Sequence, residues 1–126
     1  MLIKKFNDCQ EIIAGDSTIL RELLSGLNDP ADVRYSLAHA KLLPGKQSLK
    51  HALKTSEVYY IITGLGRMHI GEEISEVGSR DTVYIPPQAV QYIENIGDTE
   101  LEFICIVDPA WRVENEIVVS SIKYQV

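Results

Sequence analysis

Two side chains that could transfer a proton or bind a metal lie six residues apart in the stretch from Gly45 to Gly64. His51 and Glu57 precede a β-prone run at 58–63, and the stretch opens at the turn Pro44-Gly45. Imidazole and carboxylate groups are common general acids and bases, and both bind divalent transition metals. We therefore expect His51 and Glu57 to be catalytic residues, metal ligands, or both.

Short β-prone runs separated by turns make up the chain from Arg34 onward. Turn residues recur about every eight to twelve residues, a pattern typical of a β-sandwich or barrel. The predicted runs are 35–43, 50–53, 58–63, 67–70, 82–85 with 91–94, and 101–107, and the turns between them include 64–66, 71–73, 86–87 and 95–98. The sequence therefore predicts an all-β fold.

The first 33 residues are less regular. Asn7 or Asp8 could cap a short helical turn over 9–14, which Gly15 would end. The segment 18–24 is compatible with either a strand or a helix, because its leucines also fit a helical stripe. A loop rich in Gly, Asn, Asp and Pro follows at 25–32.

Length and composition indicate one globular domain. The chain has 126 residues, 45% hydrophobic and 24% charged, with a formal net charge of −6. An acidic chain without a basic cluster argues against nucleic-acid binding. The N-terminus lacks the apolar core of a signal peptide, and no apolar run reaches the roughly 18 residues of a membrane span. We expect a cytoplasmic protein with no membrane partner.

Two cysteines, Cys9 and Cys105, are too few for a disulfide framework. Cys105 lies within an apolar run, where a free cysteine behaves as a small hydrophobic residue. Neither cysteine has the spacing of a zinc or redox motif, so both are expected to be structural.

The spacing around His51 resembles the first motif of the cupin superfamily. That motif reads Gly, five residues, His, one residue, His, three or four residues, Glu, six residues, Gly. Gly45, His51, Glu57 and Gly64 match it, and Leu53 stands in place of the second His. The chain is thus similar to the family at four of five positions.

A second cupin-like motif follows at 80–95. Asp81, Pro86 and Asn95 match the family pattern, whereas Arg80 and Gln88 replace glycines and Gln91 replaces a histidine. The resemblance, which covers about 35–107, implies a small single-domain cupin β-barrel of the conserved-barrel type, also described as a double-stranded β-helix or jelly roll. In this chain it would comprise a partly helical N-terminal segment (1–33), the conserved barrel (34–108) and a β-prone C-terminal extension (109–126).

The resemblance also implies a metal site, built in the family from the two histidines, the glutamate and the second-motif histidine. Here only His51, Glu57 and Gln91 could serve, so we expect a divalent transition metal (Mn, Fe, Ni, Cu or Zn) to bind weakly. Further candidate ligands are His39, His69, Tyr59 and Tyr84. Strand alternation places His69 opposite Met68 and Ile70, away from the interior, and places Tyr59 beside Glu57. Tyr59, Tyr84 and Asn95 are the expected pocket residues.

Two functions are compatible with these residues. The first is a metal-assisted isomerase or epimerase acting on a sugar-like molecule, with His51 or Glu57 as acid or base. A dioxygenase is less favoured, because it usually needs two histidines and a carboxylate. The alternative is a non-catalytic cupin with a degenerate metal site, in which His51 and Glu57 are a hydrogen-bonded pair in a ligand-binding or structural protein.

The β-prone tail 116–126 and the pairing habit of cupins predict a homodimer, because a free β-rich edge tends to associate.

Overall fold

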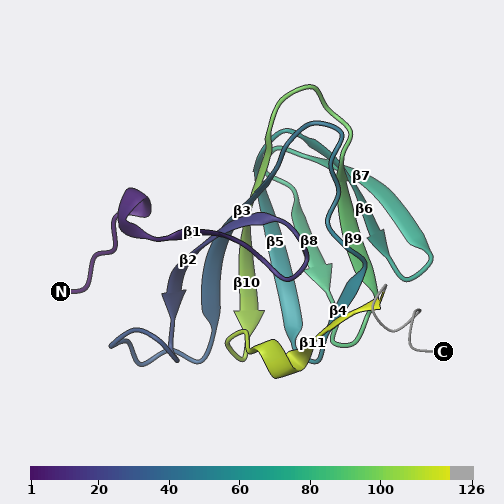
Figure 1. Cartoon of the computed structure of the whole chain (residues 1–126). Coiled ribbons are helices and arrows are strands. Elements are labelled where there is room, and N and C mark those ends of the chain that lie inside the picture. The colour runs from purple at the N-terminus through teal and green to yellow at the C-terminus, as the bar shows by residue number, and fades with distance from the viewer. Residues whose placement is uncertain (120–126) are drawn as a thin grey trace.

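Antiparallel strands in two facing layers form the fold of residues 1–119, the part of the chain that the computed structural model describes (Figure 1). The elements are η1 (Phe6–Asp8), β1 (Glu11–Ile13), β2 (Ile19–Ser25), β3 (Ser36–Leu42), β4 (His51–Leu53), β5 (Ser56–Thr63), β6 (Leu65–Ile70), β7 (Glu73–Gly78), β8 (Thr82–Ile85), β9 (Gln91–Asn95), β10 (Leu101–Asp108), η2 (Val113–Asn115) and β11 (Glu116–Val118). One sheet has the order β1-β2-β3-β10-β5-β8 and the other β11-β4-β9-β6-β7.

The core between the sheets follows from residue alternation along the central strands. In β10 the buried positions are Leu101, Phe103, Cys105 and Val107, and every second residue faces outward. β5 alternates in the same way, and its Tyr59 ring packs against the Phe103 ring with centroids 4.6 Å apart. The period of two, which the sequence showed, directs one face of each strand into a shared core.

Most of the predicted β runs are confirmed as strands, with two differences. Strand β7 was missed, because its residues Glu73 to Gly78 are largely exposed and carry little apolar alternation. The run 82–85 with 91–94 was grouped as one unit, but β8 and β9 belong to opposite sheets. The turn at Pro86 and Pro87 sends the chain from one layer to the other.

The prediction of a helical turn over 9–14 was wrong. The only helical residues before β1 are the 3-10 turn η1, and Glu11–Ile13 pairs with Ile19–Arg21 as an antiparallel hairpin. The β-branched pair Ile12 and Ile13 favours a strand, and the hairpin closes at Ser17 with a φ of 72°. The open question over 18–24 is also answered, because this segment is the second strand of that hairpin.

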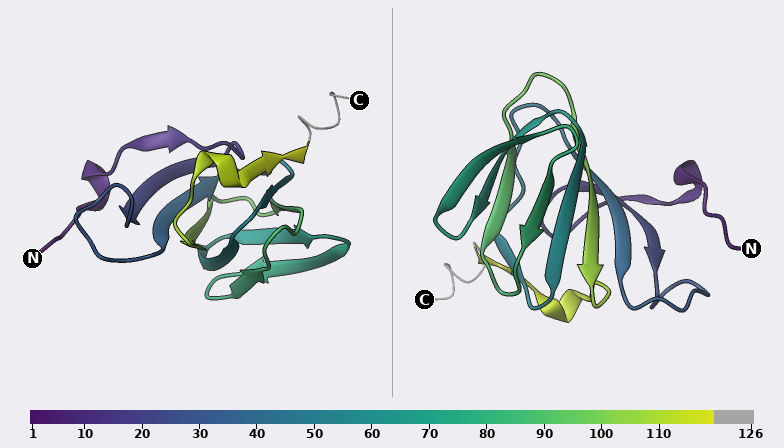
Figure 2. Two further views of the ribbon diagram at one scale, coloured as in Figure 1. Left: turned by 90° about the horizontal axis from the view of Figure 1, so that it is seen from below. Right: turned by 180° about the vertical axis from the view of Figure 1, so that it is seen from behind.

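The β1–β2 turn and the η2–β11 segment lie along the same side of the barrel. Figure 2 shows the β1–β2 turn beside the η2–β11 segment in the view from below. β11 pairs with His51–Leu53 in its own chain, which accounts for the first three residues of the β-prone tail, while 120–126 lie outside the described residues. The helical turns η1 and η2 have three residues each, and the described chain has no helix long and apolar enough to cross a membrane.

Candidate functional site

A cavity of about 370 Å³ lies between the two sheets, and His51 and Glu57 reach it from opposite layers. His51 is the first residue of β4, and Glu57 is the second residue of β5. Only the short turn at Lys54 and Thr55 separates these strands, so six residues of sequence span the width of the barrel. The structure therefore brings the two predicted catalytic residues to one cavity.

His51 is held in a single orientation. Its side chain is almost completely buried, and Nδ1 lies 2.7 Å from the carbonyl oxygen of Leu49. A carbonyl oxygen can only accept, so Nδ1 carries the proton and donates it. The other nitrogen, Nε2, makes no hydrogen bond within the described residues, and its nearest charged neighbour is Asp16 Oδ2 at 3.6 Å. A neutral His51 thus presents a lone pair at Nε2.

Glu57 belongs to a hydrogen-bonded chain with Gln91 and Tyr59. Tyr59 Oη donates to Gln91 Oε1 at 3.1 Å, and Gln91 Nε2 donates to Glu57 Oε1 at 2.9 Å. Burial raises the pKa of Tyr59 well above its ordinary value, with a smaller contribution from the nearby Glu57. The phenol therefore remains a donor and directs the Gln91 oxygen toward itself.

Burial also raises the pKa of Glu57 to about 8. The hydrogen bond from Gln91 lowers it, and the neighbouring Asp16 and Glu116 carboxylates raise it further, but desolvation is the largest effect. The carboxyl is therefore mostly protonated at neutral pH and can donate a proton.

Two acidic residues that the sequence analysis missed line the same cavity. Asp16 comes from the β1–β2 turn, and Glu116 begins β11. The Glu116 carboxylate packs against Gly15, and a Cβ at this position would have to push that carboxylate aside. Burial raises the pKa of Glu116, the charge that His51 carries when it is protonated lowers it, and the Asp16 carboxylate raises it. Both acids lie outside the conserved barrel, so only their place between β-prone segments could have suggested them.

The metal-binding prediction requires His51, Glu57 and Gln91 to converge, and they do not fit that role. Gln91 directs its only oxygen at Tyr59 and its amide nitrogen at Glu57. Leu53 lines the cavity with an apolar side chain. Within residues 1–119 no group of three or more His, Cys, Asp or Glu side chains is arranged to hold a metal ion. A hydrogen-bonded chain thus occupies the place that a full ligand set would need.

Tyr84 and Asn95 are not brought to the cavity, which corrects their assignment as pocket residues. Tyr84 is 61% exposed, because Val83 and Ile85 take the inward positions of β8. Asn95 is buried, but its amide donates to the carbonyls of Leu42 and Thr99, and its oxygen accepts from the backbone of Gly97. Asn95 therefore holds loops together.

His39 and His69 also lie away from the cavity. His39 Nε2 is 3.0 Å from Glu102 Oε1, and its ring meets the Phe6 ring edge-on at 4.9 Å. His69 stacks on Tyr92 with centroids 4.0 Å apart. Both histidines thus belong to outer faces of the sheets. Cys105, one of the two free cysteines, does line the cavity, and burial raises its pKa well above the ordinary value.

Comparisons with known proteins agree with this architecture. A sequence model of the cupin domain matches residues 38–107. The uncharacterized protein MJ1618 of Methanocaldococcus jannaschii is 38% identical over 112 residues, which cover 88% of this chain and 89% of that protein.

Two solved structures are similar in fold. A cupin 2 conserved barrel domain protein from Salinispora arenicola has a TM-score of 0.74 at 15% identity, covering 100% of this chain and 98% of that one. A predicted oxalate decarboxylase from Thermotoga maritima has a TM-score of 0.73 at 21% identity, covering 86% of this chain and 99% of that one. At such identities the likeness concerns the fold alone.

Proposed function

Because this chain belongs to the cupin family, we propose that the cavity between its sheets binds a small molecule and moves a proton on it, as an isomerase or epimerase does. Family membership supports the binding cavity, since small β-barrels hold ligands between their sheets or in their mouths. Cupin folds serve several chemistries, so the reaction is argued from the side chains.

The observation that carries this proposal is the orientation of His51. The Nδ1 proton is committed to Leu49, so Nε2 is the basic atom and is left without a hydrogen bond. Glu57 lines the same cavity from the other sheet and, with a pKa near 8, supplies a proton at neutral pH. A base and an acid facing one cavity from opposite sides are the groups that a proton shift beside a carbonyl needs.

Exchange of carbon-bound protons tests this proposal. We expect the protein to accelerate deuterium incorporation beside the carbonyl of a compound in a panel that includes glyceraldehyde, hydroxyacetone and phenylacetone. His51→Gln should lower that rate by at least about 100-fold, because general base catalysis contributes that much or more. NMR in deuterated water measures the exchange.

His69→Gln is the matched control, since it changes the same residue type outside the cavity. An unchanged exchange rate in the His51 variant would remove His51 from the mechanism. Absence of exchange with every compound in the wild-type protein would favour the non-catalytic alternative.

The apolar cavity wall disfavours a sugar, and the bonded Gln91 amide disfavours a metal. Much of the cavity wall is apolar, including Leu20, Leu53 and Val107, which suits a less hydroxylated molecule than a sugar. The one atom of Gln91 that could bind a divalent metal, its amide oxygen, already accepts a hydrogen bond from Tyr59. We therefore assign the proton transfer to His51 and Glu57 themselves.

The non-catalytic alternative has one specific observation in its favour. Tyr59, Gln91 and Glu57 satisfy one another in a buried chain, as polar groups retained for structure also do. In that case the cavity would bind a ligand without changing it.

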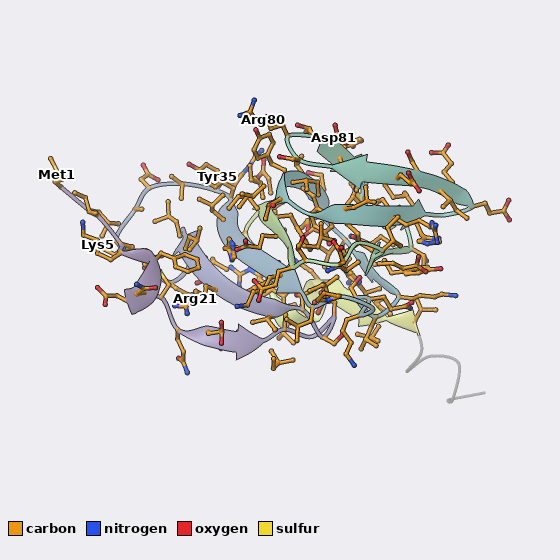
Figure 3. The ribbon with its side chains drawn as sticks, turned by 90° about the horizontal axis from the view of Figure 1, so that it is seen from above. Met1, Lys5, Arg21, Tyr35, Arg80 and Asp81 are labelled. Carbon is orange, nitrogen blue, oxygen red and sulfur yellow. The ribbon has the colours of Figure 1, made fainter. Side chains whose placement is uncertain are left out.

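We also propose a homodimer, which the exposed edge strand β1 supports. β1 is an outer strand of its sheet, and Ile12 and Ile13 on it are 45% and 69% exposed. Figure 3 shows Met1 and Lys5 standing clear of the barrel on the side of Arg21. An exposed apolar edge strand favours pairing with a second copy.

We expect sedimentation velocity to find a dimer at micromolar concentration and Ile13→Lys to shift it to monomer. Val113→Lys serves as the control, because Val113 is 72% exposed but lies outside the edge strand. A wild-type monomer would refute the proposal.

A further inference from the structure

We propose that the cavity selects a small organic cation, namely an amine carried on an apolar body. This inference rests on the proposed function only in requiring that the cavity be a ligand site. It narrows the class of ligand from the charges and the unpaired acceptors around the cavity.

The charge of the cavity wall is one-sided. Asp16, Glu22 and Glu116 line it beside Glu57, whose carboxyl is mostly protonated at neutral pH. None of the lining residues in the described chain is Lys or Arg. Glu22 accepts a hydrogen bond from Asn28 at 2.8 Å and lies at the rim. An anionic ligand would meet carboxylates without any permanent positive charge to pair with, which is costly at a site shielded from water.

Two buried acceptors face each other without a donor between them. Thr18 donates its backbone and hydroxyl hydrogens to Asp16 Oδ1, at 3.1 and 2.7 Å, which leaves Oδ2 free of these bonds. That oxygen lies 3.6 Å from His51 Nε2, beyond hydrogen-bond distance. When His51 is neutral, with its proton on Nδ1, both atoms are acceptors. The side chains of His51 and Asp16 are only 2% and 12% exposed.

A primary ammonium group fits this arrangement because it carries three donors and no acceptor. It could donate to Asp16 and His51, and its charge would also face Glu116 on the neighbouring wall. A ligand that covers these acceptors without donating to them leaves them unpaired, which is unfavourable. A ligand that supplies donors should therefore bind more tightly here than one that supplies acceptors.

The rest of the wall determines the body of the ligand. Leu20, Leu53, Val107 and Trp111 line the cavity, and a volume of about 370 Å³ lies in the lower part of the usual range for small-molecule sites. An apolar chain or ring therefore matches these walls better than a polyol. A bare divalent ion would need several ligands converging at one point, and the described residues contain no such group.

Three probes that differ in one functional group test the inference by calorimetric titration at pH 7. They are 2-phenylethylamine, 2-phenylethanol and phenylacetate, which are cationic, neutral and anionic on the same body. We expect the amine to bind about tenfold more tightly than the alcohol, and phenylacetate to bind most weakly, because hydrogen bonds to charged groups are the stronger ones.

Glu116→Gln should weaken binding of the amine about tenfold and leave the alcohol nearly unchanged. Glu114→Gln is the control, since Glu114 is two residues away and its side chain is 63% exposed. Equal binding of amine and alcohol, or tighter binding of phenylacetate, would overturn the cation preference while leaving the ligand site in place. Failure of all three probes to bind would overturn both the cation preference and the proposed ligand cavity.

Discussion

Replacing Glu57 by glutamine is expected to stabilise the protein, and to do so increasingly as the pH rises from 5 to 9. Burial raises the pKa of Glu57 from an ordinary value of 4.5 to about 8. Between these two values the folded protein keeps a proton that the unfolded chain has released, so the wild-type free energy of unfolding falls with rising pH. Above pH 8 the full cost of the buried charge is present.

The expected size of this effect is large. A shift of the Glu57 pKa from 4.5 to about 8 lowers the free energy of unfolding at high pH by at most roughly 5 kcal/mol, at about 1.36 kcal/mol per pKa unit. Glutamine has the same shape, and its oxygen can still accept the bond that Gln91 Nε2 donates to Glu57 Oε1. The variant therefore loses the titrating group while the hydrogen-bonded chain is kept.

Urea unfolding at pH 5 and pH 9 measures the difference between variant and wild type. We expect that difference to be several kcal/mol larger at pH 9. Glu72→Gln, a change on the exposed turn between β6 and β7, should show no comparable dependence on pH. A Glu57 variant that is equally stable relative to wild type at both pH values would mean that the carboxyl is not held in its protonated form.

The barrel itself was predictable because its signals are local. Gly45 and Gly64 have φ values of 78° and 101°, a region that glycine enters without the steric cost of a Cβ. Arg80 and Gln88, which stand where the family has glycine, keep φ values of 73° and 69°. The turn geometry is thus retained after the glycine is lost.

The missed elements depend on interactions that are distant in sequence. β1 is a strand because it pairs with β2, whereas three residues have almost no periodicity of their own. β7 lies at an edge of its sheet, where its one partner among the described strands is β6. An edge strand of exposed residues carries little of the apolar alternation from which strands are recognised.

The candidate site was predictable where its signals are local, as they are for the barrel. His51 and Glu57 belong to a motif with fixed spacing, and alternation placed Tyr59 beside Glu57. Asp16 and Glu116 are one hundred positions apart and meet because β11 pairs with β4 while the backbone N–H of Leu49 donates to the Asp16 carbonyl. Tyr84 could have been excluded, since Ile85 next to it was the better inward residue.

The double substitution Leu53→His and Gln91→His is expected to create a metal site. Leu53 and Gln91 occupy the two ligand positions that this chain lacks, and both are buried, at 4% and 1% exposure. Gln91 is the register partner of His51 across β4 and β9, and it already contacts the Glu57 carboxyl. Histidines here would complete a set of three imidazoles and one carboxylate, which suits Zn²⁺ and Ni²⁺.

Metal binding should then compete with the proton on Glu57, since a ligand carboxyl must be ionised. We expect the apo double variant to be less stable than wild type by about 1 to 3 kcal/mol, because an apolar contact and a buried amide pair are lost. At a metal concentration of 100 times the dissociation constant, binding would raise the free energy of unfolding of the double variant by about 2.7 kcal/mol.

Thermal unfolding with and without Zn²⁺ or Ni²⁺ measures this gain, and circular dichroism establishes that the double variant is folded. Wild type should shift far less, because its Gln91 oxygen is turned toward Tyr59. The same double variant carrying His51→Ala should lose most of the gain. A folded double variant that ignores both metals would show that the cavity geometry, and not only the two missing ligands, prevents metal binding in this chain.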